Sequence, residues 1–179
     1  SNAEAEYFSD GITEEIINAL AKIKELKVTS RTSSFSFKGS SSSISEIGEQ
    51  LNVSIILEGS VRLSGTSARI TAQLIEVEND FHFWSEKFDR DLNNIFAVQD
   101  EISLIIADKL REHLGHFELE ERLVDSYNVP LETYKKYLKG RFHLMKLDYP
   151  NTLKAISIFE EVIQDSPEFP LPYLDVNQG

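Results

Sequence analysis

The feature of this sequence that most constrains its fold is a spacing near the carboxyl end, where Ala155 is followed by Phe159 and then by Pro167. In two antiparallel helices a small side chain allows close approach, a phenylalanine fills the groove, and a proline ends the second helix. The spacing therefore predicts a helical hairpin, with helices at Thr133–Lys146 and Pro150–Gln164. One such hairpin cannot bury its own apolar face, and about three are needed for a stable array.

The two ends of the sequence indicate a piece of a longer protein. Ser1-Asn2-Ala3 is typical of the remnant of a cleaved purification tag. The only methionine is Met145, so no start codon is represented, and the chain ends at Gly179, where a second hairpin would begin. We therefore expect functional parts of the parent protein on either side.

Composition argues against several classes of function. The net charge of −12, from 30 acidic and 18 basic residues, repels phosphate backbones, so we expect no nucleic-acid binding by this segment. The absence of cysteine excludes disulfides, thiol catalysis and zinc fingers. No apolar run approaches the roughly 20 residues that span a bilayer, so any membrane attachment is expected outside this chain.

The first part of the chain alternates helical and extended patterns. Apolar residues at helical spacing predict a helix over Asp10–Glu25, with Asp10 as its cap. The β-branched run Lys27–Thr32 predicts a short strand. Ser43 and Glu46 form the pattern of a capping box, which predicts a short helix after a serine-rich loop.

The period then changes to that of strands. Three strands are predicted at Ile55–Leu63, Ala68–Val77 and Phe81–Phe88, and the short turns between them indicate an antiparallel meander. The middle strand alternates apolar with polar residues, so one face of the sheet is expected to be buried and the other exposed to solvent. A long helix is predicted at Leu92–Leu114, with Gly115 as its terminator.

These elements predict an α/β (α+β) fold. A mixed sheet would combine parallel βα units with the antiparallel three-strand meander, packed by helices and followed by the helical hairpin. Since Asn128-Val129-Pro130 is the clearest linker, we predict an α/β domain at 7–115, a helical linker at 116–130, and the hairpin with the start of the next at 131–179.

No catalytic, cofactor or metal site is predicted. His113 and His116 would need a third metal ligand, for which Glu112 and Glu118 are candidates, but imidazoles also suit the negative carboxyl end of a helix, which is the interpretation we favour. No Gly-x-Ser-x-Gly elbow or phosphate-binding loop is present. Gly59 is explained as a strand position facing a packed neighbour.

Aromatic residues suggest both a core and an interaction surface. We predict that most of the group formed by Phe81, Phe83, Trp84 and Phe88 is core rather than a ligand-stacking site. The hairpin carries an aromatic stripe that packs only in part on its second helix. The residues we assign to protein interaction are Tyr134, Tyr137, Phe142, Tyr173 and Leu174.

Several phrases of the first 114 residues resemble those of a known bacterial module, the TolB-like amino-terminal domain, which is related to the FlgO flagellar protein. These phrases are Tyr7–Ile16, Ser30–Ser33, Val53–Arg62, Arg69–Ile75, Trp84–Asp91 and Phe96–Ile102. The segment from Leu138 to Phe142, with Ala155, Phe159 and Pro167, resembles the first tetratricopeptide repeat that commonly follows this module.

The resemblance implies a segment of a bacterial multidomain regulator. Such proteins carry an upstream output domain, either DNA-binding or a class III nucleotide cyclase, and bind protein partners through their repeats. The segment itself would be a non-catalytic sensor or scaffold without cofactor. The alternative is a receptor that binds a small molecule and relays the signal upstream. Related architectures favour the periplasm, with the cytoplasm as the other possibility.

Two departures from the resembled pattern carry structural expectations. Gly140 and Ala155 lie about three residues farther apart than usual, with Asp148-Tyr149-Pro150 as the inserted segment. No apolar strand precedes Tyr7, which such modules usually carry. We therefore expect an unpaired edge beside Val28, covered either by a second copy in a homodimer or by an amino-terminal segment that folds back.

Overall fold

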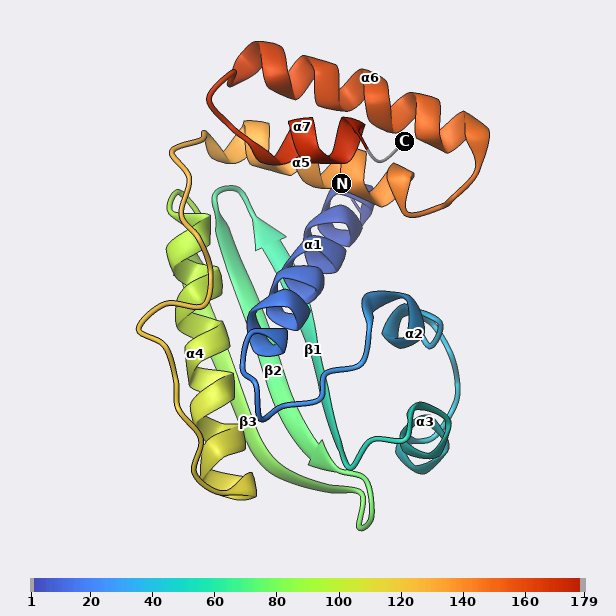
Figure 1. Cartoon of the computed structure of the whole chain (residues 1–179), viewed down its shortest axis with the longest axis vertical. Helices are drawn as coiled ribbons and strands as arrows, with labels where there is room; N and C mark the ends of the chain where they lie inside the picture. Colours follow the sequence, from blue (N-terminus) through green and yellow to red (C-terminus); the bar gives the residue numbers. More distant parts are fainter. Residues whose placement is uncertain (1, 178–179) are drawn as a thin grey trace.

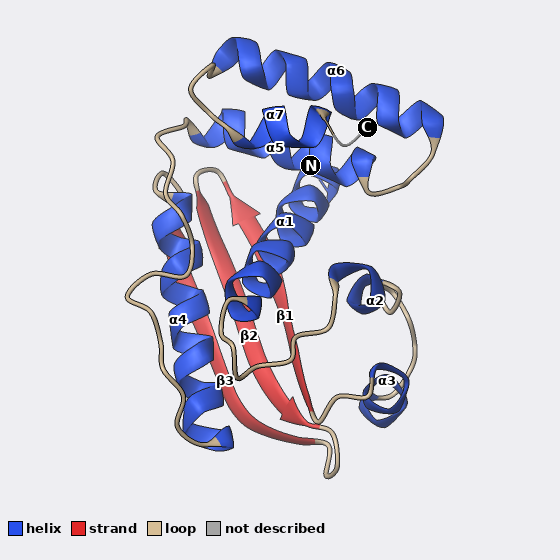
Figure 2. Cartoon of the chain, in the orientation of Figure 1, coloured by secondary structure: helices blue, strands red, loops and turns tan. Residues whose placement is uncertain are grey.

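The computed structural model describes residues 2–177, with the side chains of residues 3–177. Helices and strands follow one another along the chain as shown in Figures 1 and 2. They are α1 (Asn2–Ala21), α2 (Arg31–Phe35), α3 (Ile44–Leu51), β1 (Ile55–Ser64), β2 (Ser67–Glu76), β3 (Phe81–Asp91), α4 (Ile95–Leu114), α5 (Leu131–Leu144), α6 (Tyr149–Asp165) and α7 (Leu171–Val176).

The three strands form one antiparallel sheet in the order β1-β2-β3, so the predicted meander is confirmed. Strands β1 and β2 pair without interruption from Ile55 opposite Glu76 to Ser64 opposite Ser67. The alternation predicted for β2 is also confirmed, because the side chains of its apolar set are buried. These residues are Ala68, Ile70, Ala72 and Leu74.

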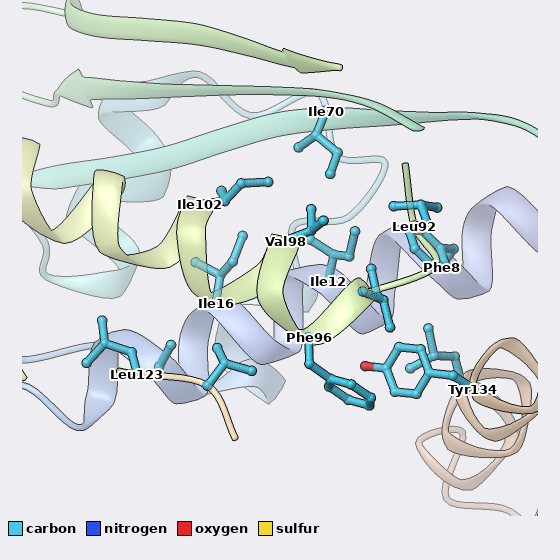
Figure 3. Packing of buried hydrophobic residues seen from close by; sticks show 14 of the residues in the cluster. Phe8, Ile12, Ile16, Ile70, Leu92, Phe96, Val98, Ile102, Leu123 and Tyr134 are labelled. Carbon is cyan, nitrogen blue, oxygen red and sulfur yellow. The ribbon is translucent and has the colours of Figure 1, made fainter. Parts of the chain in front are cut away.

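Helices α1 and α4 cover one face of this sheet, which we call the inner face (Figure 1). Their apolar stripes meet the buried side of β2, and Figure 3 shows Ile12 and Ile16 of α1 beside Val98 and Ile102 of α4, facing Ile70. The predicted stop of α4 is confirmed: Gly115 follows it with a positive φ of 107°, a conformation that glycine adopts without steric strain. Together these elements form the α+β class of fold.

Helix α3 contacts β1 and lies beside that strand, at the edge of the sheet (Figure 1). The predicted capping box is present, with Ser43 accepting from the backbone of Glu46 and the Glu46 side chain accepting from Ser43. Gly48 lies against Val77, and Ile75 is fully buried although alternation turns it away from the inner face. The helix therefore shields one end of a face that is otherwise largely polar.

The predicted strand Lys27–Thr32 is wrong, and with it the parallel βα unit. Residues 27–30 have no regular structure, and the short helix α2 begins at Arg31 because the Ser30 hydroxyl accepts from the backbone N–H of Ser33. This β-branched run has no neighbouring strand to pair with, so the capping hydrogen bond of Ser30 determines the local structure. The expected unpaired edge beside Val28 is wrong for the same reason, since no strand lies there.

Helix α1 begins much earlier than predicted. Asp10 is not its cap but lies in its middle, where the buried carboxylate accepts a hydrogen bond of 2.8 Å from Nζ of Lys38. The segment that precedes Asp10 continues α1, so it does not fold back over a strand edge as one expectation had it. Residues 22–25, predicted to be helical, follow the end of α1 at Ala21.

The segment 116–130 contains no helix, contrary to the predicted helical linker. Two backbone amides, those of Leu123 and Val124, donate to Oδ1 of Asp100 at 2.7 and 2.9 Å. Nζ of Lys22 donates to the carbonyl oxygen of Leu123 at 2.6 Å. Side chains of α4 and of the segment after α1 thus satisfy an irregular backbone that is held against the core.

The helical hairpin is confirmed as α5 and α6, which pack against each other and are followed by α7. A side chain at Gly140 would overlap the ring of Phe159, which is fully buried together with Ala155. Helix α5 also packs on α1, where Gly11 leaves room for Leu138. Within residues 2–177, no helix combines the length and apolar character needed to cross a membrane.

Candidate protein-interaction site

The structure divides the residues that the sequence assigned to protein interaction. Tyr134 and Tyr137 are only 1% and 7% exposed, so neither is available to a partner, and their assignment to an interaction surface is corrected. Phe142 is half-buried, with its ring centroid 4.7 Å from that of Tyr7. Tyr173 and Leu174 on α7 are 42% and 59% exposed and remain candidates.

The two buried tyrosines belong to an aromatic cluster that joins the helical unit to the rest of the molecule. Tyr134 lies 4.8 Å from Phe96 of α4 between ring centroids, and its hydroxyl accepts a hydrogen bond of 3.0 Å from Nε2 of Gln99. Burial raises the pKa of Tyr134 far above its ordinary value, so the phenol stays neutral. The other aromatic members of the cluster are Tyr127, Tyr137, Phe159 and Phe169.

A partly buried network of charges lies beside this cluster. The guanidinium of Arg141 on α5 binds the carboxylate of Glu14 on α1, and its Nη1 donates to Oδ1 of Asp175 on α7 at 2.6 Å. The hydroxyl of Tyr137 donates to the other oxygen of Asp175 at 2.8 Å. Burial alone would lower the pKa of Arg141, but the two carboxylates outweigh it and raise that pKa. One cation thus ties three helices together.

Three exposed apolar side chains gather where α5 turns into α6. Leu147 is 84% exposed, Tyr149 76% and Leu153 50%, and we call these three residues the corner patch. Leu147 also has a positive φ of 55°, which costs strain in any residue with a β-carbon. The other described non-glycine residues with positive φ are Asn52 and Asp80, whose side chains tolerate it better. The side chain of Leu147 therefore adds neither to the buried core nor to the stability of the turn.

The turn that presents the corner patch is well defined. Asp148 caps α6 by accepting from the backbone N–H of Asn151 at 2.9 Å. Nδ1 of His143 at the end of α5 lies 2.8 Å from Oδ1 of Asn151, which ties the two helices at the corner. The segment that departs from the repeat pattern in the sequence is thus a capped turn that holds apolar side chains in solvent.

The two histidines considered as metal ligands, His113 and His116, make other contacts. The ring of His113 stacks on Phe83 at 4.0 Å between centroids, and its Nε2 lies 3.4 Å from a carboxylate oxygen of Glu76. His116 lies 3.7 Å from Glu118. Among the described residues, no three His, Cys, Asp or Glu side chains are grouped so as to hold a metal ion. Each of the two imidazoles thus contacts its own neighbours near the end of α4.

The strand residues singled out in the sequence have packing roles in the sheet. A β-carbon at Gly59 would overlap the carbonyl oxygen of Thr71 on β2, so the prediction of a packed neighbour is confirmed. Of the aromatic group on β3, Phe88 is fully buried and Phe83 and Trp84 are half-buried, whereas Phe81 is 61% exposed. The core interpretation is thus right for most of the group and wrong for Phe81.

An open hollow on the described surface differs from a usual ligand pocket. A hollow of about 520 Å³ lies between β3, α4 and the segment after α4. Most of the side chains that line it are charged, and it opens widely to solvent, unlike the apolar clefts that bury small ligands. Its lining residues include Glu86, Asp108, Lys109, Arg111 and Glu120.

Sequence reasoning missed both the charge network and the corner patch. Arg141 lay in a recognised phrase, but its partners Glu14 and Asp175 are distant in sequence, and no local pattern connects them. Leu147 could have been noticed, because an apolar residue directly before the Asp148 cap has no place in a helical stripe. The corner patch is the strongest candidate site in the described chain.

The comparisons with known proteins agree with a regulatory role. Residues 2–105 match the model of the HilA/YgeH-like transcriptional regulators, second domain. The chain is also similar to a protein of Rhizobium meliloti (strain 1021) named "Putative adenylate cyclase 3", with 38% identity over 164 residues. This alignment covers 92% of the chain but only 28% of the relative. The chain therefore belongs to the HilA/YgeH-like transcriptional regulator family, whose second domain its residues 2–105 represent.

Proposed function

We propose that this chain is a non-catalytic, protein-binding segment of a bacterial multidomain regulator. In this proposal the α/β part is a TolB-like sensor or scaffold module, and α5 and α6 form the first tetratricopeptide repeat. The observation that carries the proposal is the corner patch, in which Leu147, Tyr149 and Leu153 remain exposed on a capped turn. Exposed apolar side chains that gather in one place mark interaction surfaces.

The distribution of exposed apolar residues supports a role for the helical unit. Within the described chain, five of the seven large apolar side chains that are exposed lie between the end of α5 and α7, and only Phe81 and Leu114 lie elsewhere. The charge network of Arg141 attaches this unit to α1 of the matched family domain. A partner bound to the unit would therefore act on a domain that is rigidly joined to it.

The comparisons support the regulatory context, and in this proposal any chemistry belongs to other parts of such proteins. The family description names transcriptional regulators, and the Rhizobium relative bears the name of a cyclase. The chain spans less than a third of that relative's length, so cyclase activity in a parent protein would be expected in a separate domain. We propose that the present segment regulates such an output domain through protein contacts.

The variant Leu147→Asn tests the proposal. Asparagine adopts a positive φ more readily than leucine does. The free energy of unfolding of the variant should therefore rise by about 0.5–1 kcal/mol, and its melting temperature should rise slightly. Binding should weaken at the same time. A photo-crosslinking amino acid at Leu153, introduced in bacterial cells, should capture a protein partner, and Leu147→Asn should reduce this capture.

A photo-crosslinker at exposed Lys87, on the sheet, is the matched control and should capture no partner. Equal capture from both positions, or capture unaffected by Leu147→Asn, would contradict a binding role for the corner patch. Incubation of the purified chain with ATP or GTP and divalent cations should give no cyclic nucleotide. Formation of cyclic nucleotide by this chain alone would contradict the non-catalytic assignment.

A further inference from the structure

The corner patch lies within a basic stretch of an otherwise acidic chain. Residues 137–159, which we call the basic segment, carry four basic side chains and one acidic side chain, a net charge of +3, whereas the whole chain carries −12. The four basic residues are Lys139, Arg141, Lys146 and Lys154. Charge that is segregated in this way gives the surface around the patch a positive potential, which attracts negatively charged partners.

Three of these four cations are available to a partner. Arg141 is bound inside the molecule by two carboxylates. Lys139, Lys146 and Lys154 are exposed, and no ion pair of theirs occurs among the described residues. Lys136, which precedes the basic segment on α5, is by contrast held by a carboxylate at 2.7 Å. The basic segment therefore presents positive charge that the described chain does not neutralise.

Two of the available lysines adjoin the apolar residues of the corner patch. Lys146 directly precedes Leu147, and Lys154 directly follows Leu153. Hydrogen bonds from the residue that it caps, and after them the charges of these two lysines, lower the pKa of Asp148 in the turn. Both ammonium groups therefore act at the turn that presents the patch.

Carboxylates of α1 lie near this surface but already have a cation of their own. Nζ of Lys38 lies 2.8 Å from carboxylate oxygens of both Glu6 and Asp10. The same ammonium group lies 5.6 Å from the centre of the Phe142 ring, and that of Lys146 lies 4.7 Å from it. Because Lys38 satisfies these carboxylates, Lys146 remains without a counter-charge.

A narrow acidic segment suits this surface better than a lipid bilayer does. The apolar side chains of the corner patch lie at the turn between α5 and α6, at the periphery of the molecule (Figure 1), so a partner segment can reach them without touching the sheet. Since the whole chain carries −12 and the basic segment +3, the remainder carries −15. A broad anionic bilayer would face this remainder and be repelled by it.

We propose that the corner patch binds an acidic segment of a partner protein. Apolar side chains of that segment would pack on the three exposed apolar residues, and its carboxylates would pair with Lys146 and Lys154. Apolar contact then supplies affinity, and charge selects the partner. This inference rests on the binding role proposed above for the corner patch and adds the chemistry of what it binds.

Synthetic peptides measure the preference directly. An amphipathic peptide of leucine and glutamate is compared with a second peptide in which glutamine replaces every glutamate, so that the two differ in charge alone. In an NMR titration the glutamate peptide should bind about tenfold more tightly or better, and this advantage should shrink as the salt concentration rises. The amide resonances of residues 146–154 should shift, and those of the sheet should not.

Reversal of the two charges tests the lysines. Lys146→Glu combined with Lys154→Glu should weaken binding of the glutamate peptide by about tenfold or more and barely affect the glutamine peptide. Lys146→Arg combined with Lys154→Arg keeps both charges and should retain binding. The matched control is K24E/K27E, which changes the net charge equally at two exposed lysines after the end of α1 and should have no such effect. Circular dichroism verifies that each variant is folded.

Three results with the purified chain would overturn the inference. The first is a glutamate peptide that binds no more tightly than the glutamine peptide, or that shifts resonances outside residues 146–154. The second is binding to phosphatidylglycerol vesicles without any preference for the glutamate peptide, which would assign the patch to a membrane surface. The third is a dimer of the chain alone that K146E/K154E abolishes, because a second copy would then occupy the patch.

The crosslinking experiment in cells separates this inference from the proposed function. Capture from Leu153 that falls with K146E/K154E, but not with K24E/K27E, agrees with both. Capture that depends on Leu147 and ignores K146E/K154E would overturn the acidic partner and leave the binding role of the corner patch intact. If nothing is captured from Leu153, the proposed function is contradicted, and the inference that rests on it fails with it.

Discussion

Helix α5 makes two contacts of different character. Toward α6 the contact is apolar, with Phe159 seated against Gly140 and beside Ala155. Toward α1 the contact combines Leu138 on Gly11 with the half-buried ion pair of Glu14 and Arg141. The first contact depends mainly on shape, with polar pairs toward both ends of the hairpin, whereas the second also requires that each charge find its partner.

The difference teaches how the helical unit is positioned. An apolar contact tolerates small sliding movements, because burial does not depend on direction. A half-buried cation between Glu14 and Asp175 favours one arrangement, since other arrangements would separate it from these carboxylates. The hairpin is therefore held together by packing and oriented on α1 by charge.

The largest effect is expected where the apolar contact is removed. Phe159→Ala empties a fully buried site and should lower the free energy of unfolding by about 3–5 kcal/mol. Urea denaturation followed by circular dichroism measures this. Ile158→Ala, at a half-buried neighbour, should have a clearly smaller effect. Equal losses for the two variants would mean that the contact of α5 with α6 does not depend on this groove.

Removal of the central cation tests the charged contact. Arg141→Met removes the cation that the half-buried carboxylate of Glu14 and the buried carboxylate of Asp175 share, and it should cost about 3 kcal/mol. Lys136→Met on the same helix breaks an exposed pair with Asp165 and should cost less than about 1 kcal/mol. If the triple variant E14Q/R141M/D175N recovers none of the loss, then unpaired charge is not its cause.

The close approach of α1 and α5 gives a smaller effect. A β-carbon at Gly11 would lie 2.5 Å from Cδ2 of Leu138, so Gly11→Ala displaces the Leu138 side chain from its place against α1. Overpacking costs about 1–3 kcal/mol, and the better helix propensity of alanine returns about 0.5–1 kcal/mol. We expect a net loss of about 1 kcal/mol in thermal unfolding. The double variant G11A/L138A should lose less than the sum of its two single changes, and strict additivity would contradict the overlap.

The smallest effect concerns the pH dependence that Glu15 contributes, a residue of α1 next to Glu14. Burial first and the neighbouring Glu14 second raise the pKa of Glu15 above its ordinary value of 4.5. The folded state therefore binds this proton more tightly, and the penalty for ionising Glu15 is absent below pH 4.5 and grows as the pH rises through the raised pKa. Glu15→Gln should raise the melting temperature at neutral pH by about 2–4 °C, the shift that 1 kcal/mol gives in such a chain.

The gain from Glu15→Gln should disappear near pH 4, where the carboxyl group of Glu15 is protonated in both states. Melting curves at pH 4 and pH 7.5 make the comparison. A gain that is equal at both pH values would show that the substitution acts through packing rather than through charge.

Much of the secondary structure was predictable because its causes are local. The capping box of Ser43 and Glu46, the alternation of β2 and the spacing of Ala155 and Phe159 act over a few residues, and each was confirmed. The run Lys27–Thr32 failed because β-branched residues form a strand only beside a partner strand. Nothing in the run itself shows that the partner is missing.

The sequence by itself determined the periods of the helices and strands, the acidic net charge and the presence of a helical hairpin. Only the tertiary structure decided which apolar residues of the helical unit face solvent, burying Tyr134 and Tyr137 while Leu147 stays exposed. Helical spacing identifies an apolar face, but α1 and α4 decide what covers it. Likewise, Arg141 meets Glu14 and Asp175 only because folding joins helices far apart in sequence, and no local pattern records that contact.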